Sequence, residues 1–190
     1  MLASASPRRA DLLRAAGYDF IIRPPAVDES IVPGESACAH VCRLADAKAA
    51  AAAAAAAPGD VVLGADTVVV VDGLILGKPA DDAEAAGMLR RISGRSHEVL
   101  TGVTLRRDGR TRSAVARTVV HFTHLTEEDL AWYVASGEPR DKAGAYGVQG
   151  LASRFVERIE GSYANVVGLP VALVARLLRD WTPEPGAGAR

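Results

Sequence analysis

The longest apolar stretch of the chain covers residues 61–76 and has the features of a buried β-hairpin. Its first eleven residues, VVLGADTVVVV, contain one charged side chain, Asp66. Such a run predicts a buried strand, broken at Gly64, and Asp72-Gly73 predicts a tight turn into a returning strand. A buried carboxylate is costly unless a cation or a metal pairs with it, so Asp66 is a candidate functional residue.

Helical periodicity alternates with further strand-like segments along the chain. Ser6 followed by Pro7 is a favoured helix start, and Thr126 with Asp129 has the pattern of a capping box. The nine consecutive alanines at 49–57 extend a long helix, because alanine is the best helix former. Helices are predicted from Pro7 to Gly17, from about 34 to 57, from 81 to 94, from 126 to 137 and from Pro170 through Trp181, and strands over 18–23, 97–105, 110–122 and 155–159.

Composition narrows the class of protein. The 22 Lys and Arg residues balance 23 Asp and Glu residues, and this near-neutral charge argues against a general nucleic-acid binder. No apolar run approaches the length of a bilayer span and no secretory signal opens the chain, so we expect a cytoplasmic protein without a membrane partner. Residues 1–181 are expected to form a single domain with two lobes, and residues 182–190 a disordered tail.

Two cysteines, Cys38 and Cys42, lie one helical turn apart with His40 between them. A metal site of this kind needs a second pair of ligands, which the chain lacks, and two cysteines cannot build a disulfide framework. We therefore expect both cysteines to be small, buried, apolar residues.

The basic residues are divided unevenly, with 19 Arg and only three Lys: Lys48, Lys78 and Lys142. Lysine is a compact, strongly hydrated point charge, so each Lys is a candidate for a position that needs one. Arg8 and Arg9 fall in the first turn of the first predicted helix, where cations oppose the helix dipole. A phosphate ligand would explain them, because the helix N-terminus and both guanidiniums would converge on it.

Carboxylates and a glycine-rich segment complete the candidate chemistry. Asp28, Glu29 and Asp66 offer oxygen ligands for magnesium, while the basic residues would neutralise a polyphosphate. Residues 141–150, DKAGAYGVQG, lack the spacing of a dinucleotide fingerprint, but glycines at this density allow a ligand to approach the backbone closely. The segment GLILGKP lacks the spacing and the Ser/Thr of a P-loop. These residues predict a nucleotide or phosphoester hydrolase.

Five segments, taken together and in order, resemble the Maf family of nucleotide pyrophosphatases, also called septum-formation proteins. They are SASPRR, GADTVVVVDG with LGKP, SGRSHEVLTGV, DKAGAYGVQG and GSYANVVGLP, and they extend from Ser4 to Pro170. The resemblance implies hydrolysis of a nucleoside triphosphate to the monophosphate and pyrophosphate, the reaction of a nucleotide diphosphatase. It also implies an ITPase-like α/β fold, with a mixed twisted sheet flanked by helices and two lobes around a central cleft.

The resemblance assigns expected roles to individual residues. Asp66 matches the catalytic acid, as general base or metal ligand, and a divalent cation, Mg²⁺ or Mn²⁺, is implied. Gln149 would read the base, and the DKAGAYGVQG form resembles the branch that acts on dTTP and UTP. Lys142 is expected to order the glycine-rich loop through an ion pair or a carbonyl contact. Phosphate contacts are implied for Ser4, Arg8, Arg9, Lys48 and Lys78, a specificity position for Thr67, and metal binding for Asp66 with Asp28 or Glu29.

Two alternatives to this function stay open at the level of sequence. One is a regulator of septum formation that binds nucleotide without turnover, and the other is a house-cleaning pyrophosphatase of different base specificity. The set of carboxylates and cations favours turnover, because a pure binder does not need a metal-ready acid in a buried strand. The resemblance further implies a homodimer whose partners are nucleoside triphosphates and not nucleic acids.

Overall fold

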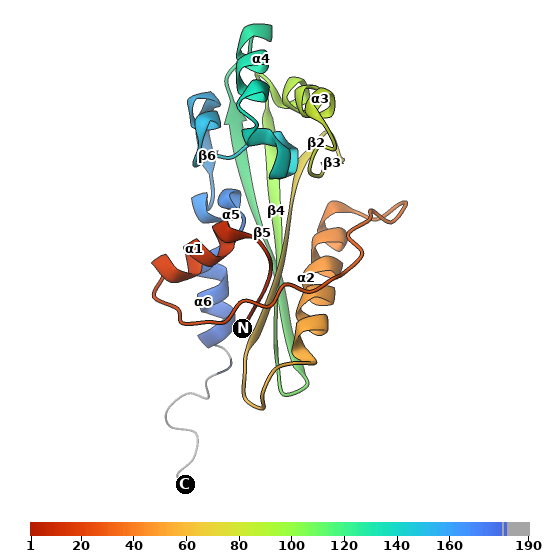
Figure 1. Ribbon diagram of the computed structural model, residues 1–190, viewed down its shortest axis with the longest axis vertical. Helices are drawn as coiled ribbons and strands as arrows, with labels where there is room; N and C mark the ends of the chain where they lie inside the picture. The colour runs from red at the N-terminus through yellow and green to blue at the C-terminus, as the bar shows by residue number, and fades with distance from the viewer. Residues whose placement is uncertain (180, 182–190) are drawn as a thin grey trace.

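The computed structural model describes residues 1–179 and 181, and a six-stranded mixed sheet runs through most of its length (Figure 1). The strand order is β1-β2-β4-β5-β6, with β3 also paired to β2. β1 runs parallel to β2, whereas β2–β3, β2–β4, β4–β5 and β5–β6 are antiparallel. The strands are β1 (Leu2–Ala3), β2 (Val62–Val71), β3 (Leu74–Leu76), β4 (Ser96–Arg107), β5 (Arg110–Phe122) and β6 (Val156–Glu160).

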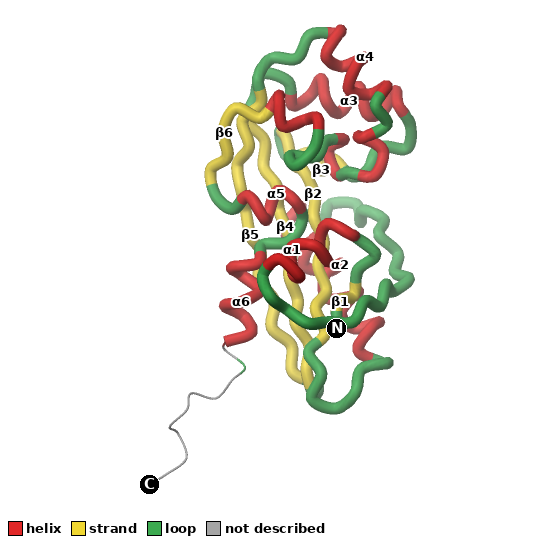
Figure 2. The backbone as a smooth tube through the Cα atoms, turned by 60° about the vertical axis from the view of Figure 1, so that its left-hand side comes forward, coloured by secondary structure: helices red, strands yellow, loops and turns green. Residues whose placement is uncertain are grey.

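Helices flank the sheet on both faces. α2 (Ala37–Ala53) covers one face, whereas α1 (Pro7–Ala15) and α6 (Val171–Arg179) lie on the other side of the sheet (Figures 1 and 2). The predicted α/β class, a mixed sheet flanked by helices, is confirmed. The structure also contains α3 (Asp82–Ile92), α4 (Glu127–Ala135), α5 (Tyr163–Val167) and the 3₁₀ helices η1 (Glu138–Asp141), η2 (Ala143–Ala145) and η3 (Leu151–Phe155).

Capping side chains set where the helices begin. The Ser6 hydroxyl accepts a hydrogen bond from the Arg9 amide at the start of α1, and the Asp81 carboxylate caps the first turn of α3 in the same way. Thr126 and Asp129 form the predicted capping box of α4. These helix starts are confirmed, and each depends on residues within a single turn.

Two of the predicted elements differ from the observed ones. The strand predicted over 18–23 is wrong, because this segment makes an isolated bridge between Ile22 and Leu2. β1 is only two residues long, so it has too few backbone hydrogen-bonding groups to pair with a strand over 18–23. α2 is shorter than predicted, since Ser36 caps its start and it ends at Ala53. The tail predicted over 182–190 lies outside the described residues, and α5 was not predicted.

The burial pattern of α2 corrects the expectation for the cysteines. Cys38 is exposed and Cys42 is partly exposed, so the prediction that both are buried is wrong. The helix instead turns His40, Val41 and Leu44 inward, because these residues share the face that packs on the sheet.

Two glycines let α2 lie close to the sheet. The predicted break of β2 at Gly64 is wrong: the strand continues through it, and a Cβ there would lie 2.2 Å from the carbonyl oxygen of Ala45. A Cβ at Gly102 in β4 would lie 2.2 Å from the carbonyl oxygen of Val41. Both atoms met are backbone atoms, so the helix itself would have to move.

Gly102→Ala is therefore expected to destabilise the protein. Overpacking of this kind costs about 1–3 kcal/mol in free energy of unfolding. Urea denaturation measures the loss, and Gly87→Ala is the matched control. Gly87 lies inside α3 with open space around it, so alanine there is expected to raise stability by roughly 0.5–1 kcal/mol. Equal stability of Gly102→Ala and the natural protein would contradict this account of the helix packing.

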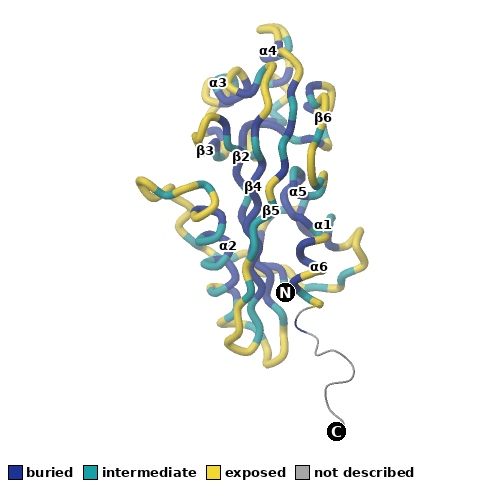
Figure 3. The backbone as a smooth tube through the Cα atoms, turned by 180° about the vertical axis from the view of Figure 1, so that it is seen from behind, coloured by how far each residue is buried: buried dark blue, intermediate teal, exposed yellow. Residues whose placement is uncertain are grey.

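The apolar core has two large clusters at the two ends of the sheet. Figure 3 shows that much of β2 and β4, between the covering helices, is buried. One lies under α3 and α4 and includes Phe122, Tyr133 and Tyr146, and the other lies under α1 and α6. Along its outer edge, β2 pairs with β1 through Gly64 and with β3 from Val69 onward. Residues 65–68 between these partners thus have no strand on that edge. No helix in the described part of the chain is long and apolar enough to cross a membrane.

Candidate active site

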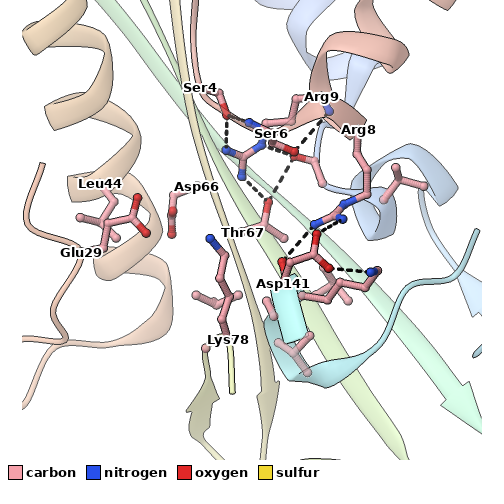
Figure 4. A pocket seen from close by; sticks show the side chains of 18 of the residues that line it. Ser4, Ser6, Arg8, Arg9, Glu29, Leu44, Asp66, Thr67, Lys78 and Asp141 are labelled. Atoms are coloured by element: carbon pink, nitrogen blue, oxygen red, sulfur yellow. Dashed lines mark hydrogen bonds and ion pairs between the residues drawn. The ribbon is translucent and has the colours of Figure 1, made fainter. Parts of the chain in front are cut away.

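A cavity of about 630 Å³ opens where the outer edge of β2 lacks a partner strand. It extends around that edge, because successive residues of a strand point to opposite faces. Asp66 faces α2 and Thr67 faces α1, and Figure 4 shows the two side chains on either side of the strand. The one charged residue of the apolar run, Asp66, thus lies in the cleft.

On the α2 side, one buried cation joins two carboxylates. The ammonium group of Lys48 donates to Asp66 Oδ1 at 2.8 Å and to Glu29 Oε1 at 2.7 Å. Lys48 and Asp66 are each 7% exposed, so this pairing satisfies charges that burial alone would disfavour. Burial raises the pKa of Glu29, but its hydrogen bond with Lys48 and the nearby positive charges outweigh that effect and lower the pKa.

On the α1 side of the strand, Arg9 connects three segments of the chain through hydrogen bonds. Its Nε donates to the carbonyl of Gly168 at 2.8 Å, and its Nη1 donates to Ser4 Oγ at 3.1 Å and to the carbonyl of Ala65 at 2.8 Å. Nη2 donates to Thr67 Oγ1 at 3.1 Å. A guanidinium has five N–H donors, and the residues described by the structure accept hydrogen bonds from four of them, which leaves one that a ligand can use.

The hydroxyl groups of Ser4 and Thr67 are engaged around Arg9. Thr67 Oγ1 also lies 2.9 Å from Thr101 Oγ1 and 3.2 Å from the carbonyl oxygen of Gly168. Ser4 Oγ accepts a second hydrogen bond from the backbone amide of Ser6. The structure therefore places Ser4 and Thr67 in direct contact with Arg9 at the cleft.

Arg8 lies at the mouth of the cleft and reaches the opposite wall. Its Nη1 donates to Asp141 Oδ2 at 2.8 Å and its Nη2 to the Asp141 carbonyl at 3.2 Å (Figure 4). Burial raises the pKa of Asp141, but the hydrogen bonds from Lys142 and Arg8 outweigh it and lower the pKa to about 2. Asp141 is 133 positions from Arg8, and no pattern in the sequence indicated this contact.

Lys142 orders the glycine-rich loop as predicted. Its ammonium donates to the carbonyl of Glu138 and to Asp141 Oδ1, each at 2.6 Å, which are a carbonyl contact and an ion pair. The aliphatic part of Lys142 also fills the space beside Gly147, where a Cβ would lie 2.6 Å from Lys142 Cε. The loop is further anchored by Tyr146, whose hydroxyl lies 2.7 Å from His97 Nε2 in the core.

The remaining predicted residues divide into those inside and outside the cavity. Lys78 and Gln149 are exposed and line it, and Figure 4 shows Lys78 pointing into the cleft. Glu29 lines the cavity, but Asp28 does not, and Asp28 Oδ1 accepts a hydrogen bond from the Ser30 amide at 2.9 Å. Of the acidic pair left open by the sequence, the structure thus turns Glu29 toward the cleft.

A divalent cation fits this arrangement if the ligand also supplies oxygens. Within the described ranges 1–179 and 181, no group of three His, Cys, Asp or Glu side chains is placed to hold a metal ion. Glu29 and Asp66, which both contact Lys48, supply two carboxylates to the site. Mg²⁺ is commonly held by one or two carboxylates together with substrate phosphates, so the donor set suits a metal–polyphosphate and not a metal alone.

The charges around the cavity define the class of protein. Its lining includes five cationic side chains and three acidic ones, and the acids at Glu29 and Asp66 are both in contact with Lys48. The cationic lining residues are Arg8, Arg9, Lys48, Lys78 and Lys142, and the acidic ones are Glu29, Asp66 and Asp141. An α/β protein with such a cleft is built to receive a phosphorylated ligand.

Comparison with known proteins places the chain in a family. The chain belongs to the Maf family, since the family of Maf-like proteins matches residues 1–181. A protein of Symbiobacterium thermophilum named dTTP/UTP pyrophosphatase is 53% identical over 95% of this chain and 93% of its own length. A Syntrophus aciditrophicus protein of the same name is 49% identical over 95% of this chain and 88% of its own.

A comparison of this structure with solved structures also gives a match. The crystal structure of a nucleoside-triphosphatase (dITP/XTP pyrophosphatase) from Mycobacterium abscessus matches with a TM-score of 0.41 and 13% identity. The match covers 96% of this chain and 97% of that one.

Proposed function

We propose that this protein is a nucleotide diphosphatase that hydrolyses dTTP and UTP to the monophosphate and pyrophosphate. The observation that carries the proposal is the buried Lys48 ammonium held between Asp66 and Glu29 in an otherwise cationic cleft. The names of the relatives, each about half identical over nearly the whole chain, support the choice of substrate.

The proposed cofactor is Mg²⁺ or Mn²⁺. Asp66 and Glu29 would hold it together with oxygens of the substrate, and Asp28 would take no part because its side chain lies outside the cavity. When bound, the metal supplies Lewis-acid stabilisation of the charge on the phosphoryl oxygens.

The other roles in the proposed reaction belong to side chains of the protein. Lys48 donates to Asp66 Oδ1, and no donor among the described residues binds Oδ2. Oδ2 is thus the atom that can take a proton from the attacking water or bind the metal. Arg8 uses only part of its guanidinium on Asp141, and with Lys78 it can stabilise the charge on departing pyrophosphate. Arg9 offers one N–H and chiefly fixes α1 and β2 around the substrate.

Hydrolysis of dTTP in ¹⁸O-labelled water tests the proposed bond cleavage. Attack of water on the α-phosphorus places the label in the monophosphate, and this is the expected result by ³¹P NMR and mass spectrometry. Label in pyrophosphate would show attack on the β-phosphorus. Formation of the diphosphate with inorganic phosphate would show cleavage at the terminal phosphate, and either outcome would refute the proposed reaction.

Gln149→Ala tests the proposed reading of the base. The Gln149 side chain is exposed in the cavity and can donate and accept hydrogen bonds at once, which suits the mixed edge of a pyrimidine. Loss of one such bond is expected to lower kcat/KM for dTTP and UTP about tenfold. The loss for dATP is expected to be smaller. Equal losses for all three substrates would remove the base-reading role.

A further inference from the structure

The segment that carries Glu29 is a long loop fastened to α2 at two places. Between the bridge at Ile22 and the cap at Ser36 the chain forms no helix or strand. One fastening is the ion pair between Glu29 and Lys48 inside the cavity. The other lies just outside it and involves Arg43, which is five residues before Lys48 on the same helix.

The second fastening joins Arg43 to two points of the loop, the Glu35 carboxylate and the Ser30 carbonyl. Its Nε and Nη2 donate to the two carboxylate oxygens of Glu35, each at 2.7 Å, in a bidentate pair. The same Nη2 donates to the carbonyl of Ser30 at 3.0 Å. Glu35 also contacts His40 Nδ1 at 3.1 Å, and its amide donates to the carbonyl of Val32 at 3.0 Å.

Packing and charge both hold the Arg43–Glu35 pair in one geometry. The Glu35 side chain is 10% exposed, so its geometry is constrained by packing as well as by charge. The Arg43 guanidinium holds the pKa of Glu35 down at about 2, so the carboxylate stays ionised at neutral pH. The arginine thus keeps a bidentate partner, and its remaining donor capacity reaches the Ser30 carbonyl.

We propose that Arg43 and Glu35 are positioning residues for Glu29. The Ser30 carbonyl is one residue from Glu29, so pinning it to α2 fixes the backbone from which the Glu29 side chain enters the cavity. Glu29 itself is half exposed, and Lys48 is its one ion-pair partner among the residues that the structure describes. Without Arg43, the loop loses the tie at Ser30 and keeps the contacts of Glu29 with Lys48 and of Glu35 with His40, so the Glu29 carboxylate spends less time beside Asp66. The proposal rests on the role given to Glu29 in the proposed function.

A mutant cycle tests whether Arg43 acts through Glu29. Arg43→Met is expected to raise the Mg²⁺ concentration for half-maximal activity about 10–100-fold, the usual effect of losing a partner that orients a metal ligand. Glu29→Gln is expected to do the same, and the double variant is expected to be no worse than Glu29→Gln alone. Arg43→Lys keeps the charge but not the fork, so it should restore part of the loss. Multiplied effects in the double variant would overturn the proposal.

The matched control is Arg106→Met. Arg106 makes a bidentate ion pair with Asp46 of α2, with distances of 2.7 and 2.9 Å, but neither residue lines the cavity. This variant is expected to leave the Mg²⁺ requirement unchanged. A change as large as that of Arg43→Met would show that any weakened contact of α2 has the same effect, and it would overturn the positioning role.

Amide hydrogen exchange tests the same proposal without turnover. In the protein free of metal and nucleotide, Arg43→Met is expected to speed exchange in residues 27–35, whereas Arg106→Met is expected to leave that segment unchanged. Unaltered exchange in Arg43→Met would overturn the proposal even if activity fell. If the natural protein releases no pyrophosphate, the proposed function fails, while this comparison still decides whether Arg43 holds the loop.

Discussion

Asp66→Asn is expected to lower kcat for dTTP by at least about 10²-fold, the scale of lost acid–base catalysis. Asparagine preserves the volume of the side chain but cannot take a proton and is a poor metal ligand. Lys48 keeps its contact with Glu29 in this variant, so it retains one of its two ion pairs and the fold is expected to survive. Steady-state kinetics measures the loss, and circular dichroism with thermal unfolding checks the fold.

Asp46→Asn is the control for this experiment. Asp46 is also a paired carboxylate, held by Arg106, but it lies outside the cavity. Its replacement is expected to leave kcat unchanged. Near-normal turnover in a folded Asp66→Asn variant would refute the assignment of Asp66 as the reacting carboxylate.

Lys48→Met is expected to damage both stability and activity. Removing the ammonium leaves Asp66 buried without its partner and close to the charge of Glu29. Removal of one partner from a buried ion pair costs about 3–5 kcal/mol in free energy of unfolding, and the exposure of Glu29 places the expected loss near the lower figure. Turnover is expected to fall as well, because the two carboxylates lose the cation that holds them together.

A double variant separates the charge effect from a packing effect. Lys48→Met combined with Asp66→Asn removes the unpaired charge, so it is expected to be more stable than Lys48→Met alone. Urea denaturation of both variants measures the difference. A Lys48→Met protein as stable as the natural one would contradict the buried pairing.

Local signals in the sequence predicted much of the fold. The capping box at Thr126 and the turn at Asp72-Gly73 both depend on neighbouring residues, and both are present in the structure. The errors arose where distant contacts decide. Gly64 reads as a break in a strand, but its lack of a Cβ serves the close approach of α2. Cys38 is apolar enough to be buried, yet it lies on the outer face of that helix.

The sequence identified most of the functional residues that line the cavity, but it did not indicate how they are arranged. Arg8 and Arg9 are adjacent and look equivalent, yet Arg9 is buried in four protein hydrogen bonds while Arg8 spans the mouth of the cleft. The partner of Arg8, Asp141, lies in the glycine-rich segment that the sequence singled out, although no role for its carboxylate was predicted. The choice between Asp28 and Glu29 depends on the path of a loop without regular structure, which no periodicity encodes.

The proposed reaction is hydrolysis of pyrimidine nucleoside triphosphates in this cleft with the help of a divalent cation. Release of pyrophosphate from dTTP, UTP, dATP and dGTP, measured with Mg²⁺, with Mn²⁺ and with a chelator, tests it most directly. Rapid, metal-dependent release is expected from dTTP and UTP, slower release from the purine nucleotides, and none with the chelator. Binding of dTTP or UTP without release of pyrophosphate under any of these conditions would contradict it.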